Sequence, residues 1–188
     1  EEVYQFVRSE SIYTEQTEIQ RLEVIETESY GRVMLQDGEL QIATTGDAAV
    51  HEAMCHPPMV VHDDPAEVLI VGGGDGASTR EVLKHDPDHV DVVEIDDRVI
   101  DVAKEYFPEF ARDFDDPRVA VHNMDGRRFV REGERTYDIV IMDISDPQGP
   151  AKTVFTSDFY RELKPRLTDT SVLHTHCESP DVARDDFY

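Results

Sequence analysis

From residue 66 onward, short apolar runs alternate with segments that have helical periodicity. The apolar runs are AEVLIV (66–71), HVDVVEI (89–95), RVAVH (118–122), YDIVIM (137–142) and a weaker one near 170–176. The segments between them predict helices at about 77–85, 97–106, 125–132 and 156–164. Strands that alternate with helices form parallel sheets with both faces covered. We therefore expect an α/β fold, built on a Rossmann-like doubly wound parallel sheet.

The first part of the chain has the pattern of an antiparallel sheet. Residues 19–25 alternate apolar and polar side chains, as a half-buried strand does. Residues 31–43 predict two short strands around Asp37-Gly38, a dipeptide that favours a tight hairpin turn. So small a sheet is marginally stable by itself, and we expect it to pack in a homodimer or homotetramer.

A short helix is predicted to follow, from about Asp47 to Met54, because two consecutive prolines come after it. We expect a small N-terminal β-strand domain over 1–58 and a Rossmann-like catalytic domain over 59–188. The chain has no initiator methionine and ends without a closing element of structure. We therefore expect a fragment that is incomplete at its C-terminus.

The chain is strongly acidic, with 42 acidic against 18 basic residues and a formal charge of −24. This balance argues against nucleic acid and against anionic membranes as partners. Its clear apolar runs argue for a folded protein with an acidic surface, as in a halophilic organism, where salt screens the repulsion. The two cysteines, Cys55 and Cys177, form no disulfide or metal-binding pattern. This cysteine usage favours a reducing cytosol, and no apolar stretch approaches the ~18 residues of a membrane span, so we expect a cytoplasmic protein.

A glycine-rich loop joins the first strand of the parallel sheet to its helix. In VLIVGGGDGASTREVL, the residues Gly72, Gly74 and Ala77 fit the pattern G-x-G-x-x-G/A, and Glu94 ends the next strand about 20 residues later. Glycines allow a ligand to approach the backbone closely, and the acid can accept hydrogen bonds from ribose hydroxyls. The pattern favours a nucleoside-type ligand over an ordinary tight turn. The glycines of this loop are Gly72, Gly73, Gly74 and Gly76.

Two further acids narrow the identity of this ligand. Asp75 lies in the centre of the loop, where it would repel a pyrophosphate or the carboxylate of S-adenosylmethionine and attract an ammonium group. Asp125, followed by Gly126, comes directly after the third strand, within reach of an adenine edge. Alternatively, Asp125 only caps the helix that follows.

The stretch IMDISDPQGPA places Asp143 and Asp146 beyond the end of a central strand, in a loop stiffened by prolines. Open α/β sheets bind ligands at this edge. Two carboxylates there suggest a cationic substrate with spaced amines, one of which must lose a proton before it can attack. A carboxylate withdrawn from water beside another carboxylate is a suitable general base. The alternative is that these acids cap the next helix.

These stretches together resemble the spermidine synthase family, the polyamine aminopropyltransferases. The resemblance runs from Gln20 to about Leu167. It is carried by VLIVGGGDG, VVEID, NMDGRRF and DISDPQGPA, and supported by QRLEVIETESYGRVMLQDGELQ and HEAMCHPP. It implies a class I methyltransferase-like sheet and the transfer of an aminopropyl group from decarboxylated S-adenosylmethionine to putrescine or a related amine, releasing methylthioadenosine. Decarboxylated S-adenosylmethionine is a co-substrate, and the resemblance implies neither a cofactor nor a metal.

The resemblance also implies roles for individual residues. Asp143 is the proton acceptor, and the substrate-binding residues are Gln20, His51, Asp75, Glu94, Asp125, Gly126, Asp146 and Pro150. Among them, Asp146 holds the attacking amine, Asp75 the propylamine of the donor, and Glu94 the ribose. Asp125 and Gly126 contact the adenine, and Pro150 lines the thioadenosine site.

The chain departs from the family pattern near the acceptor. Gly46-Asp47 stands where the family has Asp-Glu, and Val50 stands where it has Tyr, just before His51. The acceptor pocket is therefore altered, and agmatine or another amine is an alternative to putrescine. The sequence also leaves open an S-adenosylmethionine-dependent methyltransferase, which Asp75 opposes, and a non-catalytic adenosyl-binding homologue.

The charge predicts a salt-dependent stability. Self-repulsion among −24 charges should loosen the fold when screening is weak. The midpoint of thermal unfolding should therefore rise between ~0.1 M salt, where the Debye length is ~10 Å, and ~1 M salt, where it is ~3 Å. A midpoint that stays constant over this range would contradict the interpretation of a surface adapted to high salt.

Overall fold

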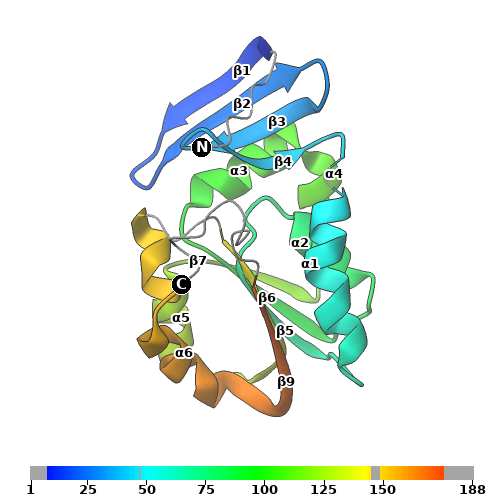
Figure 1. Ribbon diagram of the computed structural model, residues 1–188, viewed down its shortest axis with the longest axis vertical. Coiled ribbons are helices and arrows are strands. Elements are labelled where there is room, and N and C mark those ends of the chain that lie inside the picture. The colour runs from blue at the N-terminus through cyan, green and yellow to red at the C-terminus, as the bar shows by residue number, and fades with distance from the viewer. Residues whose placement is uncertain (1–7, 47, 145–148, 176–188) are drawn as a thin grey trace, which may run out of the picture.

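The computed structural model describes residues 8–46, 48–144 and 149–175, which form two sheets with helices (Figure 1). The N-terminal sheet is an antiparallel meander in the order β1-β2-β3-β4. Its strands are β1 (Arg8–Gln16), β2 (Arg21–Thr27), β3 (Gly31–Gln36) and β4 (Glu39–Ala43). The predicted hairpin at Asp37-Gly38 is confirmed, and both residues have positive φ, of 50° and 90°. The sequence analysis missed β1, whose polar sequence has little alternation.

The second sheet is parallel throughout, with the strand order β7-β6-β5-β8-β9. Its strands are β5 (Glu67–Gly72), β6 (His89–Glu94), β7 (Val119–Asn123), β8 (Tyr137–Asp143) and β9 (Leu167–Thr175). After β7 the chain crosses to the other side of β5, so the strand order reverses between β5 and β8. In open α/β sheets, ligands bind at the carboxyl ends of the strands at such a switch point.

Helices cover both faces of the parallel sheet, which confirms the doubly wound fold. One face carries α2 (Ala77–Leu83), α3 (Asp97–Tyr106), α4 (Pro108–Ala111) and the 3-10 helix η1 (Arg112–Asp115). The other carries α5 (Gly126–Glu132) and α6 (Ser157–Leu163), with the 3-10 helices η2 (Gly149–Val154) and η3 (Lys164–Arg166) beside α6. No helix in the described part of the chain is long and apolar enough to cross a membrane.

The side chains of strand β5 pack into two hydrophobic cores, one on each face of the parallel sheet. Val68 and Ile70 pack with α1 (Ala48–Val61) and α2 on one face, whereas Leu69 and Val71 pack with α5 and α6 on the other. All four side chains are buried, which explains the continuous apolar run in the sequence. The N-terminal sheet joins the first of these cores through four buried side chains: Leu22, Val24, Met34 and Ile42.

Helix α1 (Ala48–Val61) is longer than the sequence analysis predicts, because it continues through Pro57 and Pro58. Proline in a helix removes a backbone donor and costs ~3 kcal/mol. Burial of Met54, Cys55 and Met59 against the parallel-sheet core offsets this cost. The expected domain boundary after residue 58 falls within α1, and the division of the chain into 1–58 and 59–188 stays a prediction.

The end of β5 requires a glycine. Gly72 has φ of +88°, and a Cβ there would lie 1.8 Å from the carbonyl oxygen of Asp143, its register partner on β8. Gly38 has nearly the same φ, +90°, with nothing within 4 Å of the added Cβ. An alanine at Gly38 would therefore suffer backbone strain alone, whereas an alanine at Gly72 would suffer the same strain and a steric overlap as well.

We expect Gly38→Ala to lower the free energy of unfolding by ~1–2 kcal/mol, the cost of a left-handed alanine. Gly72→Ala should lower it by a further ~1–3 kcal/mol, because the methyl group overlaps the backbone of β8. Chemical denaturation of both variants at multimolar salt measures the difference. Equal losses would show that β8 can move away from β5 at little cost.

Candidate active site

The candidate site lies at the carboxyl edge of the parallel sheet, where β5 and β8 end side by side. Gly72 and Asp143 are register partners, and the Gly73 N–H donates to the Asp143 carbonyl oxygen at 3.0 Å. A Cβ on Gly73 would lie 3.0 Å from Asp143 Oδ2. The glycine loop therefore passes directly over the Asp143 carboxylate, with no side chain in between.

Three predicted site residues meet at this edge from different elements: His51 of α1, Asp75 of the glycine loop and Asp143 of β8. Each offers an atom within 4.8 Å of the others. His51 is 3% exposed and Asp75 is 8% exposed. One oxygen of Asp75 accepts a hydrogen bond of 2.8 Å from the Ala77 N–H at the start of α2, which fixes this side chain.

Asp143 Oδ2 differs from the other buried carboxylates of the described residues. It is buried and has no hydrogen-bond partner among them. By contrast, Glu81 pairs with Arg80 at 2.9 Å, and Asp91 accepts from Tyr137 at 2.7 Å and contacts His122 at 2.6 Å. A buried carboxylate oxygen without a donor is costly, and it suggests a site that a ligand's donor completes.

The chemistry of this group suits a cation. Two carboxylates can accept charge-assisted hydrogen bonds from an ammonium group. Carboxylate oxygen and imidazole nitrogen are also ligands for divalent metal ions, so the same three side chains could hold one. In either case, a positive charge relieves the repulsion between Asp75 and Asp143.

Glu94, at the end of β6, is held by backbone donors. Its Oε2 accepts from the Gly74 N–H at 3.2 Å and its Oε1 from the Asp96 N–H at 2.9 Å. Burial raises the pKa of Glu94 to about 7; the nearby carboxylates of Asp75 and Asp96 raise it too, and the two hydrogen bonds oppose the rise. A Cβ on Gly74 would lie 2.6 Å from Glu94 Cγ, so glycine is needed for this approach.

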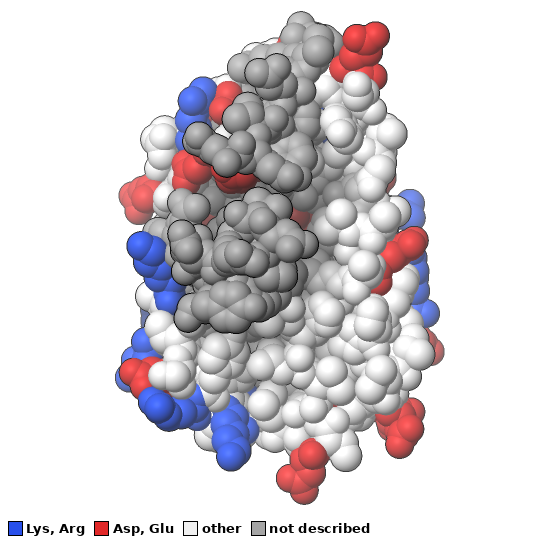
Figure 2. All heavy atoms as spheres, viewed as in Figure 1, with Lys and Arg blue, Asp and Glu red and all other residues white. Residues whose placement is uncertain are grey.

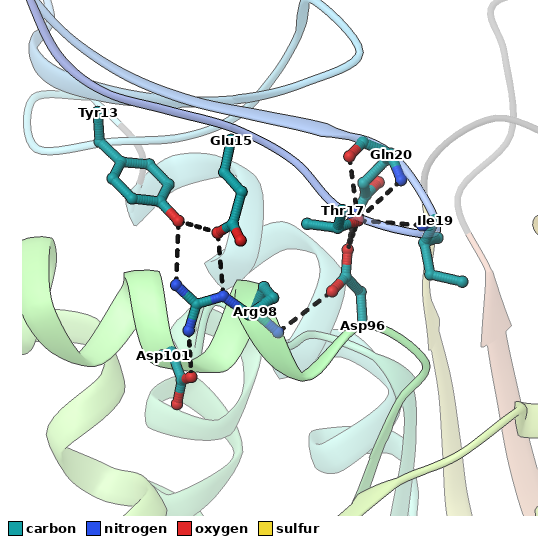
Figure 3. Close-up of polar contacts among 8 residues, drawn as sticks. All are labelled: Tyr13, Glu15, Thr17, Ile19, Gln20, Asp96, Arg98 and Asp101. Carbon is teal, nitrogen blue, oxygen red and sulfur yellow. Dashed lines mark hydrogen bonds and ion pairs between the residues drawn. The ribbon is translucent and has the colours of Figure 1, made fainter.

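The sequence analysis missed Asp96, which joins the site to the N-terminal sheet (Figure 3). Its Oδ2 accepts from Thr17 Oγ1 at 2.8 Å and from Gln20 Nε2 at 3.2 Å. The predicted site residue Gln20 is thereby tied to the residues that follow β6. The available signal was a second acid two positions after Glu94, within the stretch VVEID.

Asp125 caps helix α5, as the simpler interpretation predicted. Its Oδ1 accepts from the Arg128 N–H at 2.8 Å. The preceding Met124 N–H donates to the Glu94 carbonyl oxygen at 3.0 Å, so the chain enters α5 next to the end of β6. Gly126 packs on β5, where an added Cβ would lie 2.7 Å from Val71 Cγ1. Capping uses one oxygen of Asp125 and leaves the other available to a ligand.

Part of the predicted acceptor side lies outside the described residues. Asp146 and Asp47 are among the residues that are not described, and the side chain of Pro150, in η2, is likewise not described. Val50 is described, and its side chain is 65% exposed, although the next residue, His51, is buried. A valine thus stands at the surface beside a buried histidine of the site.

The charged side chains on the face seen in Figure 2 are spread over its margins, with acidic and basic groups interspersed. The basic side chains at the lower left of this view lie over the region of α5 and α6 in Figure 1. Arginines of α5 form ion pairs with acids: Arg127 contacts Glu162 of α6 at 2.7 Å, and Arg128 contacts Glu132 at 2.9 Å. Acidic side chains therefore interrupt the basic ones on the described part of this face.

Two family models match the chain. The model of the spermine/spermidine synthase domain matches residues 47–188, and the model of the spermidine synthase tetramerisation domain matches residues 9–44. The first covers the parallel sheet with α1, and the second covers the N-terminal sheet. The two matches meet between β4 and α1.

Similar proteins are named polyamine aminopropyltransferases. The chain is 41% identical over 172 residues to a polyamine aminopropyltransferase of Lachnoclostridium phytofermentans, covering 91% of this chain and 61% of the relative. It is 42% identical over 173 residues to one of Desulforudis audaxviator, covering 92% and 63%. The chain therefore spans about three fifths of the length of these relatives.

Solved structures agree with these matches. A spermidine synthase in complex with the transition state analogue AdoDATO has a TM-score of 0.90 and 34% identity, over 93% of this chain and 60% of that one. The spermidine synthase of Thermotoga maritima has a TM-score of 0.90 and 33% identity, over 97% and 62%. With a family model matching most of its length, and with this fold, the chain belongs to the spermine/spermidine synthase family.

Proposed function

We propose that this chain forms the donor-binding and catalytic part of a polyamine aminopropyltransferase. In this reaction the nitrogen of an amine attacks the propyl carbon beside the sulfonium of decarboxylated S-adenosylmethionine. The carbon–sulfur bond breaks, its electron pair returns to sulfur, and methylthioadenosine leaves as a neutral thioether. The amine loses one proton. The leaving group is already cationic, so the protein needs chiefly to orient the two substrates and to accept that proton.

The observation that carries this proposal is the carboxylate of Asp143. Its buried Oδ2 has no partner among the described residues, and it lies at the switch point of the sheet. An acceptor that no structural donor occupies can take a hydrogen bond, and then a proton, from an attacking amine. We assign this role to Asp143 and propose Asp146, from the same loop, as the residue that holds the amine.

The remaining residues suit the donor substrate. Asp75, with one oxygen fixed by the start of α2, would bind the ammonium of the aminopropyl group. Glu94 would accept from the ribose hydroxyls, and Asp125 would accept from the adenine amino group beside Gly126. A negative charge at Asp75 would also disfavour S-adenosylmethionine itself, whose carboxylate would lie nearby. This argues against a methyltransferase.

The acceptor amine and the assembly are further proposals. Putrescine is the first candidate, and the exposed Val50 beside His51 keeps agmatine or another amine as a second. The match of residues 9–44 to a tetramerisation domain supports a homo-oligomer, as a dimer or tetramer. The charge of −24 supports a salt-rich setting, and a cytoplasmic location is proposed from the absence of a disulfide framework in the sequence. Pro150 and His51 are proposed to line the substrates.

Incubation of the protein with decarboxylated S-adenosylmethionine and a panel of amines tests the proposed function. Methylthioadenosine should form only with an amine present, and the best amine identifies the acceptor. Methyl transfer from S-adenosylmethionine would instead support a methyltransferase. Nucleoside binding without any turnover would support a non-catalytic homologue.

Asp143→Asn tests the assignment of the base. The amide keeps the size of the side chain but cannot accept the proton, so kcat should fall by ~10²–10⁴-fold. The dissociation constant of methylthioadenosine should stay unchanged. Asp75→Asn is the comparison variant: it should weaken the donor and reduce the preference for the decarboxylated form. Turnover of Asp143→Asn close to the unsubstituted protein would refute the mechanism.

The pKa of Glu94 predicts a pH-dependent nucleoside affinity. Burial raises this pKa from 4.5 to about 7, and ribose hydroxyls donate to the ionised form. Protonation therefore competes with binding, and methylthioadenosine affinity should fall by about tenfold per pH unit below about pH 7. Calorimetric titration between about pH 5 and 8 measures it. Glu94→Gln should bind weakly with no such dependence.

The stability of the unliganded protein should depend on pH in the opposite sense to the nucleoside affinity: because of Glu94, it should fall as the pH rises. A raised carboxyl pKa means that folding favours the protonated form. This contribution to stability is fully present below pH 4.5 and is lost as the pH rises through about 7.

The affinity prediction has its own contrary outcome. A nucleoside affinity that is constant between about pH 5 and 8 would show that Glu94 does not take part in binding.

A further inference from the structure

The carboxylate of Asp96 makes more contacts than its place at a helix terminus requires. Asp96 is the N-cap of α3, and its Oδ1 accepts from the Arg98 N–H at 3.1 Å. Asparagine or serine caps a helix equally well, because capping needs one oxygen. The second oxygen of Asp96 accepts from Thr17 at 2.8 Å and from Gln20 at 3.2 Å, and the residue is 3% exposed.

Thr17 organises the turn between β1 and β2 on this carboxylate. Its Oγ1 accepts from the backbone N–H groups of Ile19 and Gln20, each at 3.0 Å. The Thr17 N–H donates to the Gln20 carbonyl oxygen at 2.9 Å. One hydroxyl thus fixes both the path of the turn and its attachment to Asp96, so the backbone and the side chain of Gln20 are both held (Figure 3).

Hydrogen bonds also connect Asp96 to the proposed nucleoside site. The Asp96 N–H donates to Glu94 Oε1 at 2.9 Å, and Glu94 Oε2 accepts from the Gly74 N–H at 3.2 Å. Gln20 is therefore separated from the glycine loop by only two residues, Asp96 and Glu94. Its amide nitrogen is committed to Asp96, which leaves its oxygen as the end that can accept from a ligand.

A second set of contacts keeps the turn in place. Arg98 of α3 donates to Glu15 at 3.0 Å and to the Tyr13 hydroxyl at 3.1 Å, both on β1. It also donates to Asp101 on its own helix. These contacts attach β1 to α3 close to Asp96, so the position of Gln20 relative to the site does not depend on Asp96 alone.

We propose that Asp96 and Thr17 are positioning residues, which orient the Gln20 amide so that its oxygen accepts from the nucleoside half of the donor substrate. The inference rests on the proposed function, because it requires a nucleoside at Glu94. It makes the N-terminal sheet a part of the donor site. Asp96 acts through Gln20 and needs no contact with the substrate.

A double-mutant cycle on Gln20 and Asp96 tests the proposal, with methylthioadenosine affinity as the readout. In Asp96→Asn the amide oxygen still caps α3, but the amide nitrogen faces the Gln20 nitrogen, and two donors cannot pair. Gln20→Leu and Asp96→Asn should each weaken binding by about three- to tenfold. The double variant should bind no more weakly than Gln20→Leu alone. Measurement at about pH 9 keeps Glu94 ionised in every variant.

Two control sets complete the design. Thr17→Ser keeps the hydroxyl and should keep the affinity for methylthioadenosine. Thr17→Val should weaken this affinity in the protein that has Gln20, but should cause no further loss when it is combined with Gln20→Leu. Asp101→Asn removes an exposed carboxylate of α3 that contacts Arg98, and it should leave the affinity unchanged.

The outcomes separate the two proposals. Losses that multiply in the double variant would overturn this inference, because Asp96 would then act on the fold and not through Gln20. An unsubstituted protein that does not bind methylthioadenosine would overturn the proposed function, and this inference with it. Binding by the unsubstituted protein together with a non-additive cycle supports both.

Discussion

The close approach of β5 and β8 at their carboxyl ends is the constraint on which the site depends. Gly72 lies against the carbonyl of Asp143, and no side chain fits between them. Because the two strands end at the same level, the loop that follows β5 lies next to the carboxylate of Asp143, which ends β8. The Gly73 N–H then bonds to the Asp143 backbone, so the loop and the proposed base are positioned together.

A second constraint is the attachment of the N-terminal sheet to α3. Apolar side chains such as Leu22 and Met34 bury the sheet against the helical layer, but apolar packing tolerates small shifts. Directional contacts remove that freedom, since Arg98 binds two side chains of β1 and Asp96 binds the β1–β2 turn. The orientation of the sheet is therefore set by residues that immediately follow the proposed nucleoside-binding acid Glu94.

Local patterns were enough to predict the parallel sheet and which acids end its strands at the edge where the candidate site lies. The run that forms β5 is apolar throughout because both of its faces are buried, and the acids Glu94 and Asp143 stand out because they end such runs. Contacts distant in sequence could not be read in this way. Thr17 lies 79 residues from Asp96, and nothing in either stretch indicates the pairing. Helix α1 likewise continues through two prolines because of tertiary burial.

The acids of the site differ in how their charge is satisfied, and this difference matches their proposed roles. Asp75, Glu94 and Asp96 each accept from a backbone N–H, which holds their oxygens in place for binding and positioning. Asp143 Oδ2 is buried without such a donor among the described residues. A proton acceptor needs a lone pair that no structural hydrogen bond uses, and the cost of leaving it unpaired falls on the unliganded protein. Under the proposed function, a cationic amine would remove that cost on binding, and the feature that weakens the fold at this edge would also select the substrate.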